Sequence, residues 1–69
     1  MKQIKKELTA KEIYELWEIP RNMLQQAVNA PCPVRMREIV LNGVPRKKYL
    51  TQDVVDYFNC DMTDKVIEG

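Results

Sequence analysis

The chain has 69 residues, enough for one small domain, and its 45% hydrophobic and 30% charged composition is ordinary for a globular protein. No apolar run approaches the roughly 18 residues of a membrane span, and the basic start, Met1–Glu7, leads into no apolar signal region, so we expect a cytoplasmic protein without membrane contact. The formal net charge is only +1, but residues 19–50 carry +5 and residues 51–69 carry −4, which suggests a polyanion-binding region beside an acidic tail.

The first predicted element is a helix over about residues 10–18. Thr9 is a good N-cap, and Glu12 three residues later completes a capping box. Leu8 and Ile13 are spaced to form a hydrophobic staple across that cap.

Pro20 ends this helix and suits the start of a second one over residues 21–28. Leu24, Ala27 and Val28 form the inner stripe of the second helix. Two short helices joined by about three residues are typical of a helix-turn-helix. The outward-facing polar set, which ends just beyond the helix, is Arg21, Asn22, Gln25, Gln26 and Asn29.

A proline-containing loop over residues 29–34 follows, and then the pattern favours strands. Asn42-Gly43 is a strong signal for a hairpin, which we predict to pair residues 37–41 with 45–50. Because proline lacks a backbone N–H, the return strand either lies at a sheet edge or begins at Pro45.

The third helix is predicted over about residues 52–59, with Thr51 as its N-cap and Leu50 and Val55 as a staple. The remaining residues, 60–69, form an acidic tail that is expected to make a weak turn or remain disordered.

These elements predict a mainly α fold with a small β-hairpin, a winged helix-turn-helix in the order helix, helix, two-stranded wing, helix. Its parts are a basic N-terminal arm (1–7), the winged domain (8–59) and the acidic tail (60–69).

The residue inventory argues against an enzyme. The sequence contains no histidine and no serine, and its two cysteines, Cys32 and Cys60, have no histidine to activate them and cannot complete a zinc site. We expect both thiols to be reduced and at least half buried. The only glycines, Gly43 and Gly69, form no phosphate-binding loop. We therefore expect no catalytic residues, metal, cofactor or small-molecule substrate.

The polar set of the second helix suits double-stranded DNA, because asparagine and glutamine can bond adenine and arginine can bond guanine in the major groove. The alternative is a set that only keeps a surface helix soluble. The predicted hairpin adds cations that can bind phosphates or enter the minor groove. The alternative is that its lysines protect the edge of the sheet from pairing with other chains. We expect Tyr49, which follows these cations in the sequence, to pack under the hairpin. The cations of the predicted wing and its flank are Arg35, Arg37, Arg46, Lys47 and Lys48.

Four stretches, residues 8–13, 19–24, 31–35 and 46–54, together resemble the small winged-helix domains of the MerR superfamily, particularly the phage excisionase and AlpA-like group. The resemblance covers about residues 8–58 and implies DNA binding through the second helix and the wing. The chain departs from that pattern at Pro20, where a serine or threonine cap is more usual, and in a longer segment after the proline loop.

The resemblance implies an excisionase-like architectural factor in DNA recombination, which binds DNA in several copies and guides an integrase. A small phage or plasmid regulator of transcription is the alternative within the same binding class. A protein-interaction adaptor that reuses the winged fold is the alternative from another class.

Overall fold

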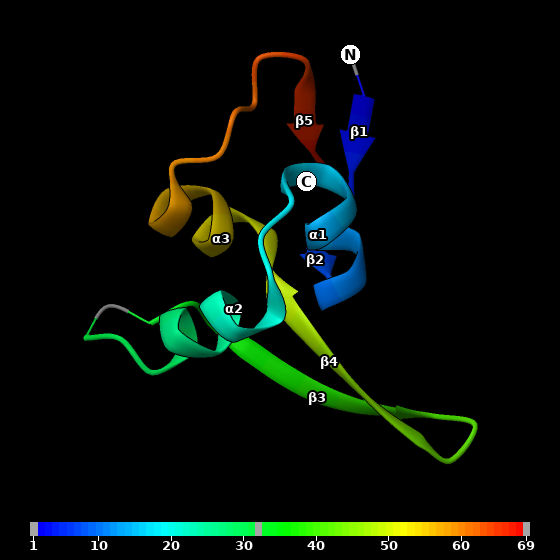
Figure 1. Ribbon diagram of the computed structural model, residues 1–69. Helices are drawn as coiled ribbons and strands as arrows, with labels where there is room; N and C mark the ends of the chain where they lie inside the picture. The colour runs from blue at the N-terminus through cyan, green and yellow to red at the C-terminus, as the bar shows by residue number, and fades with distance from the viewer. Residues whose placement is uncertain (1, 32, 69) are drawn as a thin grey trace.

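The computed structural model describes residues 2–31 and 33–68 (Figure 1). The prediction for Cys32 lies outside the described residues. Cys60 is a free, half-buried thiol, and burial raises its pKa. The elements, in chain order, are β1 (Lys2–Ile4), β2 (Glu7–Leu8), α1 (Ala10–Trp17), α2 (Arg21–Val28), β3 (Met36–Leu41), β4 (Val44–Leu50), α3 (Thr51–Phe58) and β5 (Lys65–Ile67).

The central sheet is antiparallel, with the strand order β2-β4-β3. Tyr49 of β4 pairs with Leu8 on one side and with Met36 on the other. Strand β2 covers only the last two residues of β4, so Pro45 lies in the part of β4 that is paired on one side only. This position agrees with the restriction of proline to open strand edges.

The predicted fold class is wrong. The described residues are 36% helix and 32% strand and include a three-stranded antiparallel sheet, so the protein is a small α/β domain and not a mainly α winged helix-turn-helix with a two-stranded wing. The strands absent from the prediction, β1, β2 and β5, are two or three residues long. Such short segments show no measurable alternation of apolar and polar residues, and their pairing partners are distant in sequence.

The predicted helices and hairpin occur close to their expected positions. The capping box of α1 is present: the Glu12 backbone N–H donates to Thr9 Oγ1 (3.2 Å), and the Thr9 backbone N–H donates to Glu12 Oε1 (3.1 Å). Asn42 and Gly43 have φ angles of 52° and 77°, as a two-residue type I′ turn between β3 and β4 requires.

The core lies where the three helices meet the inner face of the sheet. Tyr49 is buried in it, as expected, and Leu8 and Ile13 join it from the two sides of the α1 cap. The buried cluster consists of Leu8, Ile13, Ile19, Leu24, Ala27, Val34, Tyr49 and Val54.

The first and last strands of the chain pair with each other. Strand β1 pairs in parallel with β5, so residues 65–67 are neither a turn nor disordered, contrary to expectation. Trp17 Nε1 also donates to the carbonyl of Asp61 (3.2 Å). No helix among the described residues is both long and apolar enough to cross a membrane.

Thr51 differs from its predicted role as the N-cap of α3. It is the first helical residue and is fully buried, and Leu50 occupies the cap position. Its Oγ1 donates to the carbonyl of Lys5 (2.6 Å), and its backbone N–H donates to the carbonyl of Lys6 (3.0 Å). The threonine therefore joins α3 to the segment between β1 and β2.

Candidate nucleic-acid interface

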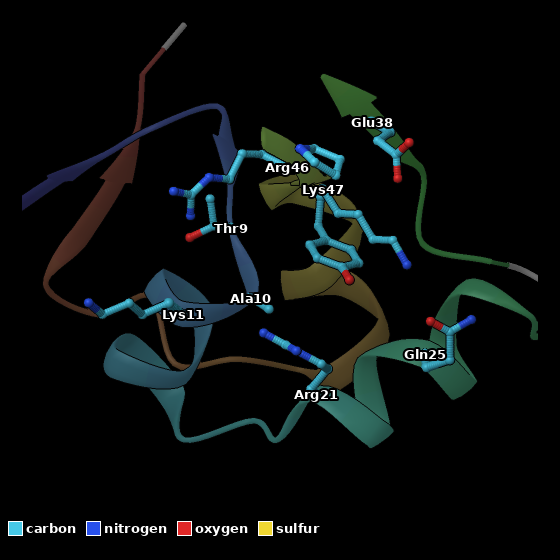
Figure 2. Close-up of a pocket in the computed structure, with 10 residues that line it drawn as sticks. Thr9, Ala10, Lys11, Arg21, Gln25, Glu38, Arg46 and Lys47 are labelled. Atoms are coloured by element: carbon cyan, nitrogen blue, oxygen red, sulfur yellow. The ribbon is translucent and has the colours of Figure 1, made fainter. Parts of the chain in front are cut away.

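A groove of about 380 Å³ runs between the start of α1, the helix α2 and the β3–β4 hairpin (Figure 2). Arg21 and Gln25 of α2 line it from one side, and Arg46 and Lys47 of β4 line it from the other. The groove therefore joins two groups of residues that the sequence analysis assigned to DNA binding on separate grounds. Its full lining is Thr9, Ala10, Lys11, Arg21, Gln25, Glu38, Pro45, Arg46, Lys47 and Tyr49.

All five polar residues proposed for α2 are exposed, while Leu24 and Ala27 of the same helix are fully buried. Arg21 and Gln25 are four residues apart and so occupy neighbouring positions on one face. They border the groove. The remaining three residues of the predicted set lie outside the groove lining and are Asn22, Gln26 and Asn29.

The start of α2 has no side-chain cap. Pro20 is its N-cap and makes no side-chain capping bond, and the first turn contains no acidic residue. Backbone N–H groups at such a terminus favour an anion, because they carry the positive end of the helix dipole. A phosphate beside Arg21 would find both a side-chain charge and this dipole.

The basic run of β4 divides between the two faces of the hairpin, because successive side chains of a strand point in opposite directions. Lys47 shares a face with buried Tyr49 and pairs across the strands with Glu38. Figure 2 shows the Lys47 side chain extending toward α2, where Gln25 lies. Arg46 and Lys48 belong to the opposite face, although Arg46 still borders the groove.

Arg35 and Arg37, which the sequence analysis grouped with these cations, form ion pairs within the protein. Arg35 Nε donates to Asp53 Oδ2 (2.9 Å), and the Arg35 backbone N–H donates to the same oxygen (3.0 Å). Arg37 is bidentate with Glu7, at 2.7 and 2.6 Å. These hydrogen bonds lower the pKa of Asp53 and of Glu7 below their ordinary values.

The two pairs join the entry to the hairpin to α3 and to β2, so both arginines have a structural role. By contrast, the other four cations of the predicted DNA-binding sets have no ion-pair partner in the part of the chain that the structure describes: Arg21, Arg46, Lys47 and Lys48.

Sequence reasoning missed the contribution of α1 to the groove. Lys11 lines the groove and is exposed, but it belongs to neither set of residues that the sequence predicts to bind DNA. Only the packing of α1 against the hairpin reveals this placement, since nothing local to Lys11 distinguishes it from other surface lysines.

The chain matches no family model, no curated protein and no solved structure. The described residues contain no group of three or more potential metal ligands among His, Cys, Asp and Glu.

Proposed function

We propose that the protein binds double-stranded DNA sequence-specifically in the cytoplasm, with α2 in the major groove and the β3–β4 hairpin on the adjacent phosphates and minor groove. The observation that carries this proposal is the shared groove, in which Arg21 and Gln25 lie opposite Arg46 and Lys47. None of these cations is engaged in an ion pair among the described residues, so each is free to neutralise a phosphate.

The side chains suit two different tasks. Gln25 presents an amide that can bond adenine in a bidentate manner, and Arg21 can bond guanine or the phosphate beside the helix N-terminus. Lys47 and Arg46 supply charge without base recognition, which positions the protein on the duplex. Arg35 and Arg37 are left out of this interface, because their charges are already compensated by Asp53 and Glu7.

Within this class we favour an excisionase-like architectural factor of a phage or mobile element, with an integrase or further copies of the chain as partners. A small transcriptional regulator is the alternative, and an integrase gene adjacent to the coding sequence would favour the first role. The resemblance of the sequence to the phage excisionase and AlpA-like group supports the excisionase-like role.

The decisive experiment measures binding to a random-sequence duplex as a function of salt. Each neutralised phosphate contributes about −0.9 to the slope of log K against log salt. If Arg21, Arg46, Lys47 and Lys48 each neutralise one phosphate, the slope is about −3.6. A slope near zero, or no binding at low salt, would exclude the proposal.

Substitutions then map the interface. Alanine at Arg46, Lys47 and Lys48 should weaken binding to all sequences about equally and reduce the slope by about 2.7. The single substitution Lys2→Ala, at an exposed lysine of β1, is a control that should leave the slope unchanged.

Gln25→Ala should instead relax the preference at particular base pairs, at a cost of about 1–3 kcal/mol for a lost bidentate contact. If it and the triple alanine variant both bind as the parent does, the site assignment is wrong.

A further inference from the structure

The end of the β3–β4 hairpin is apolar and exposed. Val40 is 67% exposed, Leu41 53% and Val44 48%, and Pro45 is exposed beside them. Figure 1 shows this end projecting away from the three helices. Exposed apolar side chains that are grouped at one projecting end suit a contact with a partner better than isolated ones do.

Apolar side chains occupy both faces of this end. Leu41 pairs with Val44 on one face, and Val40 pairs with Pro45 on the other. The next residues along β4 are the basic run 46–48, and Glu38 is the single acidic residue of the two strands. The partner must therefore offer negative charge beside a narrow slot that accepts apolar groups.

The minor groove of duplex DNA has this combination, because phosphates border it and sugars and base edges form its walls. We propose that the hairpin end enters the minor groove of the duplex that α2 reads, and that Leu41 and Val44 act as a wedge that opens a base step. This inference rests on the proposed DNA-binding function. It adds the residues that deform the DNA and the kind of sequence they select.

The width of the hairpin requires that the DNA be deformed. Paired strands lie about 4.8 Å apart before side chains are counted, and the minor groove of regular DNA is about 6 Å wide. A ribbon with apolar side chains on both faces is wider than that groove, so it must open the groove and bend the duplex toward the major groove. The preferred site should contain a deformable pyrimidine–purine step.

The position of the wedge relative to the groove follows from the register. Leu41 and Val44 are three residues beyond the Glu38–Lys47 pair along the hairpin. At about 3.4 Å per residue, the wedge lies about 10 Å along the hairpin from that pair, and Pro45, the neighbour of Val44, still lines the groove. Its selectivity is therefore separate from the base contacts of Gln25.

The test compares the parent with the double variant Leu41→Thr, Val44→Thr. Threonine is favoured in strands and, at position 44, keeps the β-branched shape of valine, but its smaller and more polar side chain is a poor wedge. Bending is measured by energy transfer between dyes at the two ends of a duplex with a central TA step. A 2-aminopurine at that step reports unstacking. We expect the parent to bend the duplex and raise the 2-aminopurine fluorescence, and the variant to lose both effects while keeping the salt slope of binding.

Val66→Thr is the matched control, since Val66 is an exposed valine in β5 and lies outside the hairpin. It should bend DNA as the parent does. Binding by the parent without bending, or undiminished bending by the double variant, would overturn the wedge and leave the DNA-binding proposal intact. Absence of any DNA binding would overturn both. If the double variant instead loses self-association in sedimentation while bending is unchanged, the hairpin end is a contact between copies and the wedge is wrong.

Discussion

The hydroxyl of Thr51 is predicted to hold α3 against the N-terminal segment. The residue is fully buried, and its Oγ1 donates to the carbonyl of Lys5 at 2.6 Å. Thr51→Val keeps the shape of the side chain but removes the donor, so the Lys5 carbonyl loses its partner. Loss of such a hydrogen bond costs roughly 1–2 kcal/mol, and in a domain of this size each kcal/mol lowers Tm by about 4–8 °C.

The assay is urea unfolding followed by the fluorescence of Trp17, the single tryptophan, and by circular dichroism. The midpoint should fall while the slope of free energy against urea stays constant, because the surface exposed on unfolding is the same. Thr63→Val is the matched control: it also removes a threonine hydroxyl that donates a hydrogen bond, to Asp61, but the site is exposed and water can replace the donor, so a change within about 0.5 kcal/mol is expected. If Thr51→Val is as stable as the parent, or no less stable than Thr63→Val, the reasoning is refuted.

Three further predictions concern the α1 cap, the Arg37–Glu7 ion pair and the Asn42-Gly43 turn. Thr9→Ala should destabilise the protein by about 0.5–2 kcal/mol in urea unfolding, since it removes the capping box with Glu12; an unchanged midpoint would contradict this. Hydrogen bonds from Arg37 hold the pKa of Glu7 below its ordinary value of 4.5, so the stabilisation is complete above that pH and is lost as the pH falls through the lowered pKa. NMR titration should show the Glu7 pKa rising toward 4.5 in Arg37→Gln, and equal values in both proteins would argue against the pair. Gly43→Ala should destabilise the hairpin because φ is +77°, even though the added Cβ would meet no atom within 4 Å beyond its own residue and its two chain neighbours. The loss of cross-strand NMR contacts between β3 and β4 would report this, and unchanged contacts with unchanged stability would contradict it.

The sequence by itself determined the local elements. The Thr9–Glu12 spacing specified the start of α1, Pro20 separated α1 from α2, and Asn42-Gly43 specified the hairpin turn. Each signal acts over a few residues, through a capping bond, a missing N–H or a positive φ, and therefore can be read without knowledge of the rest of the chain. The absence of histidine and serine is equally independent of the fold, and it is the basis of the expectation that the protein is not an enzyme.

Tertiary structure alone decided the sheets and the use of the charges. Strands β1 and β5 pair although they lie at opposite ends of the sequence. A three-residue strand acquires its conformation from such a partner and not from its own residue pattern. Likewise, Arg35 and Arg37 belong to the same basic region as Lys47 in sequence. Their acidic partners, Asp53 and Glu7, reach them only because α3 and β2 pack beside the hairpin. Electrostatic partners depend on distance in space, so only the folded structure separates the cations that stabilise the protein from those that remain free for a ligand.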